Sequence, residues 1–190
     1  LAINDVAVNA FITTNTSAAA SAISWSVCEL LYRKKVTSLG VASGIVAGLV
    51  AITPAAGFVS PLASILIGLI GGAICYTAVT FAKAKFGYDD ALDAFGCHGI
   101  GGIWGGIATG IFAWKAINSA GASGLIHGNP KLVLIQLIAV LSSVVYSAIV
   151  TFIILKVINA VSGIRVTDKD EQIGLDVTEH GEEAYGGMNV

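Results

Sequence analysis

The sequence predicts an all-α membrane protein, built as a polytopic bundle of apolar helices. Hydrophobic residues make up 55% of its 190 residues and charged residues only 12%, which is about half the charged fraction of an ordinary soluble domain. The apolar residues are gathered into five runs near or above about 18 residues, the length at which a helix can cross a bilayer. Composition and pattern therefore favour the same fold class.

We expect the five membrane spans at about residues 6–32, 39–53, 62–81, 92–112 and 132–161. The second run is short and ends at a segment in which Pro54 and Pro61 should break the helix. The fifth is long enough to tilt or to project beyond the bilayer. Residues 162–190 follow as a polar, acidic tail without another span.

The basic residues predict the orientation of the bundle. Eight of the ten lie at the end of the first, third or fifth span or after it, and so share one side: Arg33, Lys34, Lys35, Lys83, Lys85, Lys156, Arg165 and Lys169. The positive-inside rule makes this side cytoplasmic. We therefore expect a multi-pass protein of the cell membrane with an outer N-terminus and a cytoplasmic C-terminal tail.

Several other functions find no support in the residues. Cys28, Cys75 and Cys97 lie far apart in apolar segments, without metal-ligand or disulfide spacing. There is no nucleotide-binding glycine fingerprint, no P-loop and no catalytic pair of carboxylates. A net charge of −2 gives no reason to expect a nucleic-acid partner. We expect no enzymatic activity, cofactor or metal.

Because the chain begins with Leu1 and not Met, we also expect it to be a piece of a longer protein.

Small residues recur every four positions in three of the spans, and this spacing lets helices approach closely. The second span carries Gly44 and Gly48, and the third carries Gly68 and Gly72. The fourth repeats the pattern at His98, Gly102, Gly106 and Gly110. We interpret these glycines as helix-packing positions. Because His98 shares their face, it should point into protein or a lumen and not into lipid.

The first span contains the polar run TTNTS at residues 13–17. Hydrogen bonds between helices and back to the helix's own carbonyls are one explanation, and direct contact with a transported solute is another. Either way, we expect protein around most of this helix.

His98 is the histidine with the strongest functional claim, since His127 falls in a loop and His180 in the tail. A neutral imidazole offers one donor and one acceptor, which suits either structural hydrogen bonding or contact with a small solute or proton. Asp93 lies five residues earlier and off the face of His98 in a regular helix. We expect its carboxylate to cap the helix N-terminus and not to pair with His98. Asp89 and Asp90 are expected to be solvated loop residues.

Three blocks of sequence resemble the ammonium transporter (Amt/Mep/Rh) family, in the family's order. They are SGIVAGLVAITPAAGFV at 43–59, DDALDAFGCHGIGGIWGGIATGIFA at 89–113 and GLDVTEHGEEAYGG at 174–187. The third block is more similar to the bacterial and archaeal Amt branch than to the Rhesus branch.

The resemblance implies an ammonium-transporter fold of eleven helices, ten of them in two inverted five-helix repeats. It implies a homotrimer in which every subunit has its own hydrophobic pore, with ammonium deprotonated on the way through. Two histidines line this pore at mid-membrane, and His98 falls on the second. Ala94 falls on a pore-lining position, and Thr53 falls near the outer pore.

The resemblance also assigns the C-terminal tail a regulatory role in gating by a PII-type signalling protein. The tail positions that match are Gly174, Leu175, Asp176, His180, Gly181, Glu182 and Tyr185. From composition alone, disorder is the default interpretation of the tail, and docking through a few apolar residues is the alternative.

Only five of the eleven expected spans are present, and by the resemblance they are the last five. The first pore histidine, the phenylalanine gate and the outer recruitment site then belong to the preceding helices, which we count as a required partner. Phe95 is not assigned to the gate. An alternative within the same family is an ammonium sensor that signals through its cytoplasmic tail.

Overall fold

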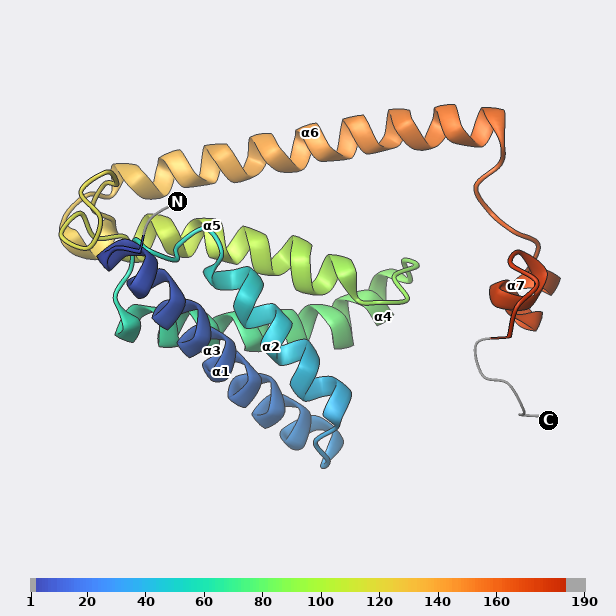
Figure 1. Ribbon diagram of the computed structural model, residues 1–190, viewed down its shortest axis with the longest axis horizontal. Coiled ribbons are helices and arrows are strands. Elements are labelled where there is room, and N and C mark those ends of the chain that lie inside the picture. Colours follow the sequence, from blue (N-terminus) through green and yellow to red (C-terminus); the bar gives the residue numbers. More distant parts are fainter. Residues whose placement is uncertain (1–2, 184–190) are drawn as a thin grey trace. The chain divides into compact units, whose positions relative to one another are not determined.

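The computed structural model describes residues 3–183, and within that range every regular element is a helix (Figure 1). The elements are α1 (Asp5–Arg33), α2 (Ser38–Ile52), α3 (Pro61–Thr77), the π-helical turn η1 (Ala78–Ala82), α4 (Lys83–Phe86), the π-helical turn η2 (Phe95–Gly99), α5 (Ile100–Phe112), the 3-10 turn η3 (Leu125–His127), α6 (Lys131–Val161), α7 (Asp168–Ile173) and α8 (Leu175–Thr178).

Helices occupy the five ranges expected from the sequence, with shifted ends. The third continues without a break from α3 through η1 and α4 to Phe86. The fourth begins at Ala94, two residues later than expected. The chain divides into two compact units, one ending at Ser143 and the other starting at Val144, and α6 contributes to both.

Short polar residues determine where α1 and α2 begin. The side chain of Asn4 accepts a hydrogen bond from the Ala7 N–H at 2.9 Å, and the Thr37 hydroxyl does the same for Gly40. Such caps satisfy backbone donors that a helix leaves unpaired at its start. The buried Glu29 carboxylate of α1 accepts two further bonds, from the N–H and hydroxyl of Thr37. The turn between α1 and α2 is thus tied to both helices.

Glycines allow α1 to lie directly against α2 and α3. A Cβ added to Gly48 would lie 2.6 Å from the Ser17 carbonyl oxygen, and one added to Gly44 would lie 2.7 Å from Trp25 Cβ. A Cβ on Gly68 would collide with the same Ser17 carbonyl. Residues with side chains at these positions would force the helices apart.

The polar run in α1 supports the structural interpretation within the described residues. Ser17 is fully buried and donates its hydroxyl hydrogen to the Gly48 carbonyl of α2 at 2.9 Å. Thr16 and Ser64 of α3 share a hydroxyl–hydroxyl bond, and Thr13 bonds back to the Asn9 carbonyl. These bonds satisfy polar groups that would otherwise be costly to bury.

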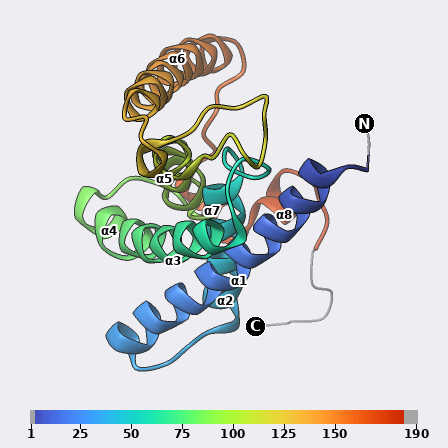
Figure 2. The same cartoon turned by 90° about the vertical axis from the view of Figure 1, so that its left-hand side faces the viewer.

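The helices α2 and α3 provide the surface on which α5 lies. In the first unit, α3 contacts both α1 and α5, and Figure 2 shows it between them. Glycines again mediate the approach of α5: a Cβ on Gly105 would lie 2.5 Å from the Ala51 carbonyl oxygen, and one on Gly101 would lie 3.2 Å from Cys75 Sγ. The position of α5 therefore follows from the α1–α2–α3 packing.

Two of the described helices are long and apolar enough by themselves to cross a membrane: 61–86, with mean hydropathy 2.1, and Lys131–Val161, with 2.5. The helix α2 is apolar but shorter, and α1 is long but carries the polar run. The 31 residues of α6 extend about 46 Å, more than the roughly 30 Å of a hydrocarbon core.

In the second unit the tail contains helical structure, so the described part of it is not an irregular chain. Thr167 caps α7 by accepting from the Asp170 N–H. Gly174, at φ 114°, separates α7 from α8. Seven residues, 184–190, lie outside the described range, and among them is the predicted tail residue Tyr185.

Replacing Gly48 with Ala should destabilise the protein by about 1–3 kcal/mol, because the new methyl group overlaps backbone and Ser21 Cβ atoms of α1. The measurement is the thermal unfolding of the complete protein in detergent. Val46→Ala, on the same helix and 37% exposed, is the matched control and should have the smaller effect. Equal destabilisation by the two would contradict the packing role of Gly48.

Candidate functional site before α5

The loop between α4 and η2 is held by two aspartates whose roles differ from the predicted ones. The carboxylate of Asp90 accepts hydrogen bonds from the N–H groups of Ala94 and Phe95, at 2.8 and 2.9 Å. Asp90 therefore provides the helix cap, and the expectation that it is merely solvated is wrong.

Asp93 does not cap the helix with its side chain, which corrects the sequence-based prediction. Its carboxylate forms an ion pair with Lys83 of α4, at 2.7 Å. The backbone explains the difference, since Asp93 has a positive φ of 55°. Asp90, and not Asp93, accepts the first free N–H groups.

The first turn of the fourth helix is the π-helical η2, which is packed against the other π-helical turn, η1. A Cβ on Gly96 would lie 2.6 Å from Val79 Cγ2. The buried Cys75 thiol donates to the Cys97 carbonyl, with 3.8 Å between S and O. Two of the free cysteines, Cys75 and Cys97, thus act as buried packing residues. Single π-helical turns like η2 occur frequently at functional sites.

His98 lies on the opposite side of η2 from these contacts. Its side chain is exposed, while its neighbour Cys97 is buried. Within residues 3–183, His98 has no hydrogen-bond, ion-pair or ring partner. Ala94 and Phe95 are exposed beside it, and the Phe95 ring packs edge-on against Tyr88. The result is a mostly apolar surface with one imidazole that is available to bind another group.

Thr53 is also exposed, but the structure does not bring it to His98. It lies at the end of α2, where its hydroxyl donates to the Leu49 carbonyl at 2.6 Å. Its neighbours Ala51 and Pro54 contact Gly105, which lies about 10 Å along the helix from His98. If both residues line one path, they line different depths of it.

The predicted glycine stripe of the fourth span divides into two parts. A Cβ on Gly106 would lie 2.6 Å from Val140 Cγ2, and one on Gly110 would lie 2.8 Å from Val133 Cα, so both glycines face α6. Gly102 has no atom within 4 Å of its Cβ direction. Within residues 3–183 no helix packs on Gly102, so its packing role stays a prediction. Gly102 belongs to the open face that carries His98.

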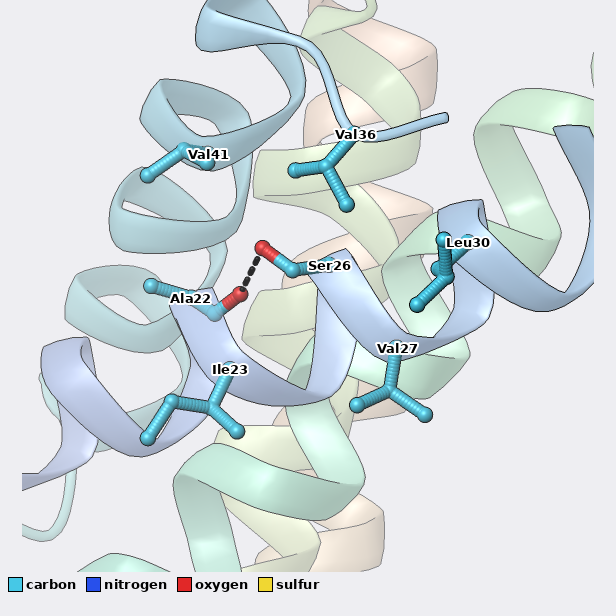
Figure 3. A pocket seen from close by; sticks show the side chains of 7 residues that line it. All are labelled: Ala22, Ile23, Ser26, Val27, Leu30, Val36 and Val41. Carbon is cyan, nitrogen blue, oxygen red and sulfur yellow. Dashed lines mark hydrogen bonds between the residues drawn. The ribbon is translucent and has the colours of Figure 1, made fainter. Parts of the chain in front are cut away.

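A separate hollow lies at the surface formed by α1, α2 and the turn between them, near the basic end of α1 (Figure 3). Ser26 is its one hydroxyl-bearing side chain, and this hydroxyl already donates to the Ala22 carbonyl at 2.7 Å. The remaining lining is aliphatic: Ala22, Ile23, Val27, Leu30, Val36 and Val41. No charged side chain lines this hollow, and it does not include His98.

The predicted tail residues form a separate group in the second unit. Leu175 and Asp176 begin α8, and the Glu182 N–H donates to the Asp176 carbonyl at 2.9 Å. Gly181 has a positive φ of 67°, and His180 is exposed before it. Across residues 3–183, no three His, Cys, Asp or Glu side chains are arranged to hold a metal ion.

The sequence matches the profile of the Ammonium Transporter Family over residues 1–185. The chain belongs to this family. It is 56% identical over 185 residues to the ammonium transporter of Bacillus subtilis, a match that covers 97% of this chain and 46% of the relative. It is 49% identical to ammonium transporter Amt1 of Archaeoglobus fulgidus, with the same coverage.

Solved structures support the same family and fold. Mep2 of Saccharomyces cerevisiae superposes with a TM-score of 0.78 and 38% identity, over 83% of this chain and 37% of that one. A protein described as a sensor Amt protein gives 0.81 and 29%, over 93% and 43%. The chain thus spans less than half the length of these relatives, and it is a membrane protein with part of the ammonium-transporter fold. The curated relatives are named as transporters and not as enzymes.

Three residues that shape the site, Lys83, Asp90 and Cys75, are not predicted by the sequence pattern. The position of Lys83 in the sequence indicates only the orientation of the helix. Asp90 lies four residues before Ala94. Because Asp93 adopts a positive φ, the loop brings the Asp90 carboxylate to the N–H group of Ala94 at the start of the helix.

Asp90→Ala should lower stability by about 1–2 kcal/mol, because two N–H groups lose their acceptor. Asp90→Asn keeps one side-chain acceptor oxygen and should cost less. Thermal unfolding of the complete protein ranks the two variants. If Asp90→Ala unfolds at the wild-type temperature, the capping role is wrong.

Proposed function

We propose that the complete protein carrying this chain moves ammonium across a membrane, with ammonia passing His98 after ammonium has lost a proton. The observation that carries this proposal is the unpartnered imidazole on an exposed, mostly apolar surface at the start of a glycine-rich helix. Family membership supplies the solute: related proteins are named ammonium transporters.

The energetics favour passage of the neutral form. A bare cation at the centre of a bilayer costs several kcal/mol or more. Ammonia carries no charge, and an imidazole can donate to it or accept from it. Potassium has a radius similar to that of ammonium but no proton to lose, so it would have to cross as an ion. Selectivity would then come from deprotonation and not from fit alone.

In this proposal His98, Ala94 and Thr53 line successive levels of one pore. The exposed side of His98 and the open position of Gly102 give the pore one wall. The facing wall, with the second histidine of the pair, would come from the preceding helices of the same protein. Such complete proteins would associate as homotrimers in the lipid bilayer.

The orientation proposal follows from the basic residues at the ends of the helices. Arg33 ends α1, and Lys83 and Lys85 lie in the last turn of the third helix. By the positive-inside rule these ends face the cytoplasm of a cell membrane, together with the C-terminal tail. The tail segment 174–182 would then be available to a PII-type signalling protein.

A second candidate function is sensing. The similarity to a structure described as a sensor Amt protein favours it, and a sensor could use the same site to detect ammonium. Ammonium-dependent partner binding without measurable flux would distinguish this function from transport.

His98→Ala in the complete protein, reconstituted in liposomes, should reduce ammonium flux about tenfold or more, or abolish its selectivity over potassium, because the imidazole that meets ammonia is gone. The measurement compares ammonium-driven and potassium-driven currents or pH changes at equal protein content.

His127→Ala is the matched control. This histidine stacks on Trp114 in the loop before α6, with ring centroids 4.8 Å apart, and its loss should leave selectivity unchanged. Flux that stays at the wild-type rate and ammonium-selective in His98→Ala would overturn the role of His98.

A further inference from the structure

The loop that precedes His98 is held in an unusual backbone conformation. Asp93 has a φ of 55°, which residues other than glycine seldom adopt, although aspartate tolerates it better than most. Such a residue persists where its surroundings determine its conformation, often at functional sites. The next residue begins the helix that carries His98.

The side chain of Lys83 binds Asp93. Its ammonium group donates to Asp93 Oδ1 at 2.7 Å and to the Asp90 carbonyl oxygen at 2.5 Å. The Asp90 carboxylate binds the N–H groups of Ala94 and Phe95. One side chain of the third helix therefore joins both aspartates that start the fourth.

This arrangement continues directly into the turn that carries His98. The Asp93 carbonyl accepts a hydrogen bond from the Cys97 N–H at 3.0 Å. On the inner side, Gly96 lies against Val79 and the Cys97 carbonyl accepts from the Cys75 thiol. The turn is held at its start through Lys83 and along its buried side by the third helix, and these contacts hold the backbone from which His98 projects.

We propose that Lys83 is a positioning residue for His98, acting through its ion pair with Asp93 to set the direction of the imidazole. This inference rests on the proposed function for its effect on transport. Stability alone is a poor explanation of the pair, because both side chains are about a third exposed, at 31% and 32%, and exposed ion pairs contribute little to folding.

The test compares Lys83→Met with Lys85→Met in the complete protein in liposomes. Lys85 lies two residues away in α4, with its ammonium group over the Phe86 ring and no ion pair among the described residues. Lys83→Met should reduce the maximal rate of ammonium flux per folded protein about tenfold, because small displacements of a reacting group have large effects on rate. The half-saturating ammonium concentration should stay within about twofold of the wild-type value, since the outer site expected to recruit ammonium belongs to the preceding helices.

Lys83→Arg keeps the charge and the donors and should restore most of the rate, whereas Lys85→Met should behave as wild type. A purely structural role would lower only the amount of folded protein. A wild-type rate in Lys83→Met, or equal losses in the two methionine variants, would overturn the proposal.

A second measurement does not depend on transport. Diethyl pyrocarbonate modifies exposed imidazoles, and mass spectrometry can follow the rate at each histidine. Lys83→Met should change the rate at His98 and leave that at His127 unaltered. If the wild-type protein carries no ammonium, the proposed function fails while this rate still tests the positioning. An unchanged rate at His98 would show that Lys83 does not orient it.

Discussion

The close contact of α1 with α2 and α3 at Ser17 determines the rest of the bundle. Its carbonyl lies where a Cβ on either Gly48 or Gly68 would be, and its hydroxyl donates to the Gly48 carbonyl. This packing sets the separation of α2 and α3, and α5 lies on both through Gly101 and Gly105. The location of His98 therefore depends on residues without large side chains, some of them far away in the sequence.

The two sides of η2 differ in their contacts: one is packed against the third helix and the other is exposed. The inner side is fixed by Gly96 and Cys97 against the third helix. The outer side presents the His98 side chain, which has no partner among residues 3–183, beside the exposed Ala94. A turn that is packed on one side and exposed on the other is suited to form one wall of a binding site, because its backbone need not move when a solute arrives. It is also the arrangement expected of one wall whose facing wall comes from other helices.

Much of this could be predicted from the sequence, and the failures have physical causes. The apolar runs and the spacing of Gly44 and Gly48 depend on helix periodicity, which is regular. The assignment of Asp93 as a cap failed because a single positive φ in the loop redirected it toward Lys83 and left Asp90 to cap. For Gly102, the small-residue spacing shows which face can be approached but not whether a neighbour lies there, and none does among residues 3–183. A π-helical turn also alters the angle between residues four positions apart. Neither the composition nor the residue spacing of this chain predicts that turn.

The most direct measurement of the central claim is a structure of the complete protein in which the imidazole of His98 is resolved. The account predicts that this imidazole faces a second histidine from the preceding helices across a narrow apolar path, with the Lys83–Asp93 pair formed. An imidazole of His98 that points into lipid, or that is enclosed by side chains with no path beside it, would contradict the account.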